Sequence, residues 1–379
     1  MKGFSYAAVI PAVLGGGMVM ADVPRVAVDI APVHGLVARV MQGVGTPDLV
    51  IAPGASPHGY SMRPSEALAL ERADAVFWMG EALTPWLEGP LGTLAADAHV
   101  TELLEVPGTL KLEFRTGAIF EAHDHDDGHH DGEHHEEDHA DHADGHNHEG
   151  HDDHDHDKHH DHEAHDDHDH DKHDHDMHKH DDHADHDDHA DHANHADHDD
   201  HADHDGHSHT GLDPHAWLAP ENAELWLMAI AEELSELDPE NAATYKANAA
   251  EGKAEIDAVI DEVNALLEPF RAKSFIVFHD AYQYFEKSFG LASAGAISLG
   301  DASDPSPARI AEIRAEVTER GVTCVFSEPQ FNPGLVATVL DGTGAKTVVI
   351  DPIGTEIPTG PTFYTDLIIG LGKAMARCG

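Results

Sequence analysis

Residues 220–267 read PENAELWLMAIAEELSELDPENAATYKANAAEGKAEIDAVIDEVNALL, and they set the architecture that we expect. Apolar residues at helical spacing predict an amphipathic helix over Pro220–Leu237, which ends at Asp238-Pro239. The following stretch, Glu240–Leu267, contains no proline and a single glycine, Gly252. It therefore predicts a second helix of about 28 residues, or about 42 Å at 1.5 Å per residue, which is long enough to connect two lobes.

Short apolar strands alternate with helical patterns on both sides of these helices. Before them, the predicted strands are 23–30, 48–52 and 75–79, and the predicted helices are 33–42 and 65–73. After them, the predicted strands are 275–278, 322–326 and 346–350, and the predicted helices are 281–289, 305–320, 333–340 and 365–377. Such alternation gives parallel sheets covered on both faces. The predicted fold class is therefore α/β, with two parallel-sheet lobes joined by a long rigid helix.

The chain divides accordingly into five parts. We expect a signal peptide at 1–21, an N-terminal lobe from 22–120 and 210–237, a low-complexity loop at 121–209, a linking helix at 238–270 and a C-terminal lobe at 271–379.

The first part has the composition of a secretory leader. Lys2 supplies a positive charge, residues 4–20 form an apolar run, and Ala21 ends a small-residue cleavage site. Pro11 within the run suits a signal peptide better than a membrane span, and a buried N-terminal helix is the alternative. No other stretch reaches the length of a transmembrane helix, so we expect a soluble, exported mature protein.

Charge is concentrated in the low-complexity loop. The chain has 73 acidic and 21 basic residues, 38 histidines and a formal net charge of -52. Residues 121–209 hold 33 of the histidines and 35 of the acids against three lysines, so this segment alone carries about -32. Met177 is its only large apolar side chain, so we expect a disordered His/Asp-rich insertion. The acidity excludes nucleic acid as a partner, because phosphate contacts need Lys and Arg.

The other five histidines are His34, His58, His99, His215 and His279. Of these, His58, His215 and His279 each follow a strand or loop beside turn residues, and a further strand ends at Asp351. Three imidazoles and one carboxylate at strand ends could converge on one ion, and zinc takes four-coordinate sites from such ligands. We assign His34 to the start of the first helix and His99 to an exposed position.

Spacing alone leaves simpler interpretations open. A lone histidine after a strand is more often a hydrogen-bonded loop residue than a ligand. Asp351 could be a turn residue, and Asp280 could cap the helix that follows it. The two cysteines, Cys324 and Cys378, could form one disulfide in an oxidising compartment or remain two buried thiols.

Five motifs, in this order along the chain, resemble those of the metal-binding solute-binding proteins of ABC transporters (cluster A-I, or cluster 9), in particular the zinc-uptake periplasmic binding proteins. The motifs are GASPHGYSMRPS (54–65), LDPHAWLAP (212–220), VFHDAYQYFEKSFGL (277–291), FSEPQFNP (326–333) and DPIGTEI (351–357). The resemblance implies the two-lobed fold with its rigid helix and a His/Asp-rich insertion between the first two motifs. It also implies pairing of Cys324 with Cys378.

Carried over residue by residue, the resemblance implies that His58, His215 and His279 are the first three metal ligands. Asp351 matches the fourth, a position that water or another acid takes in some members. Manganese members have glutamate where His279 stands, and imidazole suits zinc better than manganese. The implied function is a periplasmic, monomeric, high-affinity Zn²⁺ receptor that delivers the ion to an ABC permease. A periplasmic zinc chaperone is a further partner to consider.

Other functions remain as alternatives to this one. They are a periplasmic zinc buffer or chaperone, a receptor for manganese or another divalent metal, and a zinc hydrolase with Glu328 as general base. The H-E-x-x-H signature is absent, because His134-His135-Glu136-Glu137 lacks the pattern, and we expect no enzyme. Glu328 is instead expected to support the site or the lobe interface.

Within the insertion, a histidine recurs every third residue. These predicted weak accessory metal sites are His180, His183, His186, His189, His192, His195, His198, His201, His204 and His207. Imidazoles a few residues apart, flanked by carboxylates, can form weak chelates. We interpret the segment as a collector that raises the local zinc concentration or as a zinc sensor, and a solvated acidic linker is the alternative.

Overall fold

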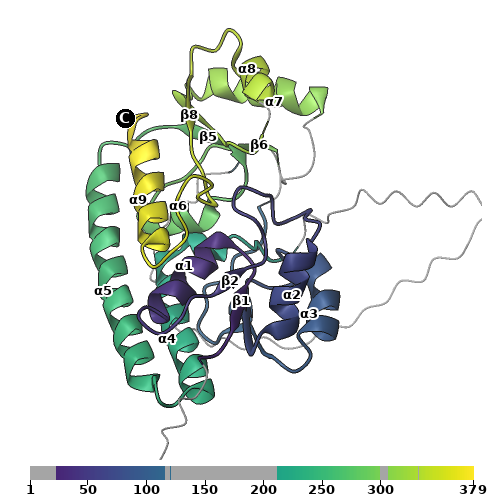
Figure 1. Ribbon diagram of the computed structural model, residues 1–379. Helices are drawn as coiled ribbons and strands as arrows, with labels where there is room; N and C mark the ends of the chain where they lie inside the picture. The colour runs from purple at the N-terminus through teal and green to yellow at the C-terminus, as the bar shows by residue number, and fades with distance from the viewer. Residues whose placement is uncertain (1–22, 116–119, 121–210, 299–305, 332) are drawn as a thin grey trace, which may run out of the picture. The chain divides into compact units, whose positions relative to one another are not determined.

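The computed structural model describes residues 23–115, 120, 211–298, 306–331 and 333–379 (Figure 1). The predicted signal peptide at 1–21 and the predicted loop at 121–209, with its ten accessory histidines, lie outside these residues.

The first sheet has four parallel strands in the order β2-β1-β3-β4. They are β1 (Val26–Val28), β2 (Asp48–Leu49), β3 (Ala75–Trp78) and β4 (His99–Glu102). Their connections contain α1 (Ala31–Val40), α2 (Pro64–Arg72), η1 (Pro85–Leu87) and α3 (Glu88–Leu94), and η2 (Leu103–Glu105) follows β4. Every residue of β1 and β3 is buried, as expected for strands covered on both faces.

The second sheet repeats this arrangement, with four parallel strands in the order β6-β5-β7-β8. They are β5 (Phe275–His279), β6 (Ala296–Ser298), β7 (Cys324–Ser327) and β8 (Lys346–Val349). The accompanying helices are α6 (Gln283–Phe289), α7 (Pro307–Glu319), α8 (Pro333–Leu340) and α9 (Phe363–Ala376). In both sheets the first strand in the sequence therefore lies between the second and the third.

Two long helices connect the sheets. After η3 (Ala216–Leu218) come α4 (Pro220–Leu237) and α5 (Ala242–Leu267). Helix α5 has 26 residues, or about 39 Å, and packs against α1, α4 and α9 (Figure 1). The long helix predicted from the sequence is thus confirmed, with its start two residues later than expected.

The single glycine of α5 has a packing role. A Cβ atom at Gly252 would lie 3.0 Å from Cγ of Arg39 on α1 and 3.1 Å from Cδ1 of Leu227 on α4. Because a methyl group here would have to push its neighbours back by a few tenths of an ångström, glycine allows α5 to approach both neighbouring helices closely.

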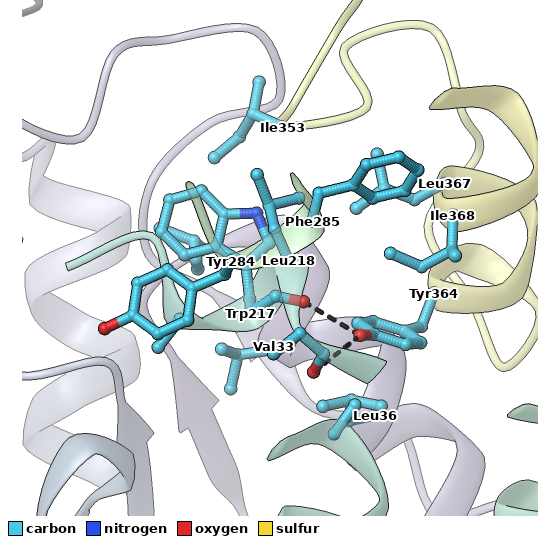
Figure 2. Packing of buried hydrophobic residues seen from close by; sticks show 14 of the residues in the cluster. Val33, Leu36, Trp217, Leu218, Tyr284, Phe285, Ile353, Tyr364, Leu367 and Ile368 are labelled. Carbon is cyan, nitrogen blue, oxygen red and sulfur yellow. Dashed lines mark hydrogen bonds between the residues drawn. The ribbon is translucent and has the colours of Figure 1, made fainter. Parts of the chain in front are cut away.

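The main core is built around Trp217, which is 1 % exposed (Figure 2). Its indole Nε1 donates to the carbonyl oxygen of Pro352, and its own carbonyl oxygen accepts from the hydroxyl of Tyr364 on α9 at 2.8 Å. Val33 and Ile353 lie in the same cluster. Segments from both sheets therefore hold η3, and with it the residue that precedes it, His215.

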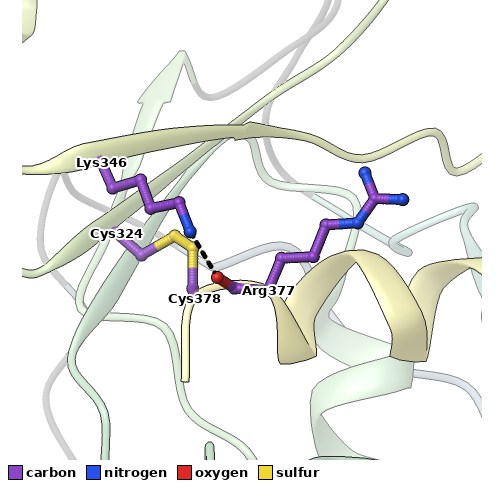
Figure 3. Close-up of a disulfide and its surroundings, with 4 residues drawn as sticks. All are labelled: Cys324, Lys346, Arg377 and Cys378. Carbon is purple, nitrogen blue, oxygen red and sulfur yellow. Dashed lines mark hydrogen bonds between the residues drawn. A yellow bond between two sulfur atoms is a disulfide. The ribbon is translucent and has the colours of Figure 1, made fainter.

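The two cysteines form a disulfide, with Cα atoms 5.9 Å apart (Figure 3). Cys324 is the first residue of β7, and Cys378 lies just after α9. Beside the disulfide, the ammonium group of Lys346 donates to the carbonyl oxygen of Arg377 at 2.6 Å. Residues 377 and 378 are thus attached to β8 and β7 of the second sheet.

The structure adds elements that the sequence patterns did not reveal. Strands β4 and β6 and helix α3 were not predicted, because they are only 3–7 residues long and carry weak periodicity. The strand predicted at 48–52 covers only Asp48–Leu49 in the structure. The amides of Val50 and Ile51 nevertheless donate to the carbonyl oxygens of Val28 and Asp29. In the part of the chain that the structure describes, no helix combines the length and apolar character needed to cross a membrane.

Candidate metal centre

Three histidines from three separate segments line one pocket with a volume of about 150 Å³. His58 lies in the loop that follows β2, His215 directly precedes η3, and His279 is the last residue of β5. The remaining walls include the side chains of Trp217 and Phe331. The pocket thus lies at the carboxyl ends of strands, where ligands bind in open α/β sheets.

The imidazoles of His215 and His279 face each other. Their Nε2 atoms are 3.3 Å apart, and the ring centroid of His58 lies 5.6 Å from that of His215. Two nitrogens bound at 2.0–2.1 Å to one tetrahedral ion would be about 3.3 Å apart. Among the residues that the structure describes, no three His, Cys, Asp or Glu side chains lie close enough together to bind one metal ion. The His215–His279 pair is therefore the preformed half of the candidate centre.

Both imidazoles of this pair are held by buried carboxylates. Oδ1 of Asp213 is 2.7 Å from Nδ1 of His215, and Oε1 of Glu328 is 2.7 Å from Nδ1 of His279. An ionised carboxylate only accepts hydrogen bonds, so in each ring the Nδ1 atom carries the proton. Each Nε2 then presents a lone pair to the other ring. Two facing lone pairs repel unless a cation or a proton lies between them, so this geometry suits metal binding.

The loop that carries His58 is anchored on both sides. Trp86 Nε1 donates to the carbonyl oxygen of Pro57 at 2.9 Å. Gly54 has φ 80°, and a Cβ there would lie 2.8 Å from Cγ2 of Thr355 in the loop after β8. Only glycine meets both requirements without strain, so the first motif contacts the last one beside the pocket.

Asp351 is not among the residues that line the pocket. Its carboxylate accepts hydrogen bonds from the amides of Ile353, Gly354 and Thr355, at 3.2, 3.0 and 2.6 Å. This is the turn geometry considered as the alternative from the sequence. In the structure, Asp351 therefore orders the loop that brings Pro352 and Ile353 to the pocket wall.

Gln330 is a lining residue that the sequence did not single out. Its Nε2 donates to Oγ1 of Thr355 at 3.2 Å and lies 3.4 Å from Oδ1 of Asp351. Its Oε1 is buried and has no hydrogen-bond partner. The amide oxygen is thus a further candidate oxygen ligand, or an acceptor for a water molecule on the ion. Gln330 lies within the motif FSEPQFNP, but a glutamine in a turn does not by itself predict a metal ligand.

Asp280, next to His279, does not cap the following helix. It is 3 % exposed and forms an ion pair with Arg115, while the residue at the start of α6 is Tyr282. Burial raises the pKa of Asp280, and Arg115 opposes this shift. Burial would lower the pKa of Arg115, but the neighbouring carboxylates of Glu286 and Asp280 hold it above its usual value.

The two histidines that were not predicted as ligands lie outside the pocket. His34 lies on α1, is buried, and has its Nε2 3.1 Å from the carbonyl oxygen of Pro47. His99 lies on β4 and is exposed as predicted, with its Nδ1 2.6 Å from Oε1 of Glu233.

Comparisons with known proteins agree with the motifs. Residues 26–378 match the family described as zinc-uptake complex component A, periplasmic (ZnuA). The high-affinity zinc uptake system protein ZnuA of Brucella abortus (strain 2308) is 42% identical over 353 residues, which cover 93% of this chain and 91% of that protein. The protein of the same name from Paracoccus denitrificans (strain Pd 1222) is 40% identical over 359 residues, which cover 94% and 92%.

Solved structures share the fold. A crystal structure of ZnuA matches with a TM-score of 0.62 at 18% identity, covering 94% of this chain and 99% of that one. The solute-binding protein FpvC of Pseudomonas aeruginosa, in complex with Mn²⁺, matches with a TM-score of 0.64 at 16% identity, covering 94% and 98%. At such low identity, these likenesses establish the fold alone.

Proposed function

The chain belongs to the ZnuA family of periplasmic zinc-uptake proteins, and on this basis we propose that it binds Zn²⁺ in the three-histidine pocket and delivers it to the permease of an ABC transporter. The observation that carries the proposal is the facing pair His215 and His279, with an Nε2–Nε2 distance of 3.3 Å and a carboxylate on each Nδ1. Such carboxylate–histidine pairs fix the ring orientation and the tautomer at zinc sites. His58 is the third ligand in this proposal.

The fourth ligand expected from the sequence is Asp351, with water or another acid as the alternatives. The Asp351 carboxylate already accepts three backbone hydrogen bonds in its turn, and Asp351 is not among the residues that line the pocket. These observations support water, or the amide oxygen of Gln330, in that position. Zinc titrations of Asp351→Asn and Gln330→Ala discriminate between them, because removal of the group that binds the ion lowers the affinity more.

Zinc is favoured over manganese by the ligand set. Three imidazoles suit zinc, whereas manganese prefers carboxylate and water oxygen. Related folds have been solved with Mn²⁺ and Ni²⁺, so the selectivity is a measurable property of this chain rather than of the fold. Competition between Zn²⁺ and Mn²⁺ for one site should favour zinc, and preference for Mn²⁺ would contradict the proposal.

The finer features of the proposal concern processing, assembly and chemistry. The leader is removed near Ala21, the mature protein is a periplasmic monomer, and a periplasmic zinc chaperone is a second candidate partner. No catalysis is proposed: Glu328, the candidate base of a hydrolase, bonds to Nδ1 of His279 rather than to the Nε2 side. The lobes are 22–120 with 210–237 and 271–379, and 238–270 links them.

The histidine-rich segment 121–209 has a separate role in the proposal, as a collector or sensor of zinc. Deleting it is the informative experiment. Zinc titration should show that several weak sites disappear and one tight site remains. Loss of the tight site would refute this division of roles.

Zinc uptake in a strain that lacks the protein tests delivery. Uptake at low external zinc should fall without the protein and return when the gene is restored. If the purified protein binds zinc tightly but uptake does not depend on it, the protein is a zinc buffer.

A further inference from the structure

The two chain segments that flank the 121–209 insertion pair with each other. The amide of Phe114 donates to the carbonyl oxygen of Gly211 at 2.9 Å, and the amide of Asp213 donates to that of Leu112 at 2.8 Å. Between these bonds, Glu113 and Leu212 form an antiparallel bridge. We call residues 112–115 together with 211–213 the clasp.

The clasp is bonded to the segment that follows β5. The hydroxyl group of Tyr284 on α6 accepts from the amide of Leu112 at 2.9 Å and donates to the carbonyl oxygen of Asp213 at 2.8 Å. Gln283 Nε2 donates to the carbonyl oxygen of Glu113 at 2.9 Å. One tyrosine therefore bridges both strands of the clasp.

Arg115, at the end of the clasp, forms the strongest of these contacts. Its Nε lies 3.0 Å from Oδ1 of Asp280, and its Nη1 lies 2.8 Å from Oε2 of Glu286. The side chain of Arg115 is 17% exposed, and those of Asp280 and Glu286 are 3% and 4% exposed. The ring of Phe120 stacks on the guanidinium group at 3.9 Å from the ring centroid. Charge-assisted bonds of this kind in a water-poor setting are strong and directional.

Each end of this arrangement leads to one of the facing imidazoles. Asp213, within the clasp, holds Nδ1 of His215 and also accepts from the amide of His215 at 3.0 Å. Asp280, the partner of Arg115, directly follows His279 in the chain. The clasp thus connects the segment that carries His215 to the segment that carries His279 through hydrogen bonds and ion pairs.

We infer that Arg115 is a positioning residue: by locking the clasp to Asp280 and Glu286, it sets the distance between the Nε2 atoms of His215 and His279 and so preorganises zinc binding. The inference rests on the proposed zinc function of this pocket. It goes beyond that function by assigning the base of the insertion a role in the geometry of the metal site, although Arg115 does not line the pocket.

Arg115→Met tests the inference, and Arg39→Met is the control for the loss of a buried, ion-paired arginine. Arg39 is 8% exposed and forms ion pairs at 3.1 and 2.9 Å with Glu251 and Glu255, whose side chains are 71% and 51% exposed, where α1 meets α5. Both variants lose a buried arginine, but only Arg115 is connected to the histidines. Zinc affinity is measured by competition with a chromophoric chelator, and the visible spectrum of the Co²⁺ complex reports the ligand geometry.

Arg115→Met should bind zinc about ten-fold more weakly than wild type and shift the Co²⁺ bands, because partners outside the ligand shell contribute about 10–100-fold to metal affinity. Arg39→Met should keep the wild-type affinity and spectrum. Arg115→Lys should recover part of the affinity, since it restores the charge without the two-pronged geometry. An affinity and a spectrum for Arg115→Met equal to those of Arg39→Met would overturn the inference.

Arg115→Met leaves two buried carboxylates without their counter-ion, and it can fail to fold for that reason. Arg115→Met combined with Asp280→Asn and Glu286→Gln removes the ion pairs without leaving buried charge. This triple variant should show the same weakening of zinc binding, and wild-type affinity would overturn the inference. If the wild-type protein itself bound neither Zn²⁺ nor Co²⁺ in the pocket, the proposed function would fail and the inference with it. The two failures are therefore distinguishable.

Discussion

The two sheets have the same strand order but use the ends of their central strands differently. In the first sheet, the carboxylate of Asp29, directly after β1, accepts from the backbone amide of Met79, directly after β3, at 2.7 Å. In the second sheet, His279 ends β5, and its Nδ1 lies 2.7 Å from the carboxylate of Glu328, directly after β7. Both bonds tie together the ends of two neighbouring strands.

The difference lies in what remains available for a ligand. Asp29 is completely buried, and its second oxygen accepts from the amide of Ile30 at 2.7 Å, so the whole carboxylate is used by the backbone. His279 uses Nδ1 for the strand connection, and its Nε2 lies on the pocket side, 3.3 Å from Nε2 of His215. A group with two separate polar atoms can therefore serve both structure and metal binding at one position, whereas Asp29 serves structure alone.

The largest effect should come from the disulfide, which occurs in the second sheet only. Replacing Cys324 and Cys378 by serine opens a loop with a sequence separation of 54 residues. Loop-closure entropy predicts a loss of about 4 kcal/mol in the free energy of unfolding. Urea denaturation measures it. Zinc affinity should change less than three-fold, because Cys324 lies at the end of β7 that is remote from Glu328. A loss below about 1 kcal/mol would contradict the entropy argument.

The proposed ligand role of His279 gives the next largest effect. His279→Ala should weaken zinc binding by about a hundred- to a thousand-fold, because zinc sites worth about 10–16 kcal/mol share that energy among four ligands. Asp29→Asn is the control, and its zinc affinity should remain close to that of wild type. Equal affinities for His279→Ala and wild type, measured by chelator competition, would remove the distinction between the two strand ends.

The structural role of Asp29 predicts a pH effect of about 2–3 kcal/mol. Burial raises the pKa of Asp29 from 3.8 to about 7. The folded state therefore binds an extra proton between these values, and the stability falls as the pH rises from about 4 to above 7. Without zinc, wild type should lose about 2–3 kcal/mol more than Asp29→Asn between pH 5 and pH 8, in urea denaturation at both pH values. Parallel pH profiles for the two proteins would show that Asp29 has no such shift.

The smallest effect concerns the carboxylates behind the imidazoles. Glu328→Gln keeps an oxygen that can accept from Nδ1 of His279 but removes the charge that makes the ring a better ligand. Zinc affinity should fall about ten-fold, the lower end of the range for such partners. Asp213→Asn should behave in the same way at His215. If neither variant changed the affinity, orientation by these carboxylates would be unimportant for binding.

The sequence predicted most of the fold and the three histidines, but not how the site is held. Alternation of strands and helices was sufficient for two parallel sheets, and the proline-free stretch at 240–267 was sufficient for α5. Motif resemblance selected His58, His215 and His279. The roles of Asp213 and Gln330 could not be predicted, because they depend on which atoms meet after folding. Arg115 lies far in the sequence from Asp280, and no pattern along the chain connects them.

The proposed function depends above all on one zinc ion that is bound by Nε2 of both His215 and His279. X-ray absorption at the zinc edge can identify the ligands of this ion. The sample is the 1:1 zinc complex of the protein without residues 121–209, so that no histidine of that segment contributes. We expect three imidazole nitrogens at about 2.0–2.1 Å, with the multiple-scattering pattern of imidazole, and loss of one of them in His279→Ala. A shell made of oxygen alone, or an unchanged shell in His279→Ala, would contradict it.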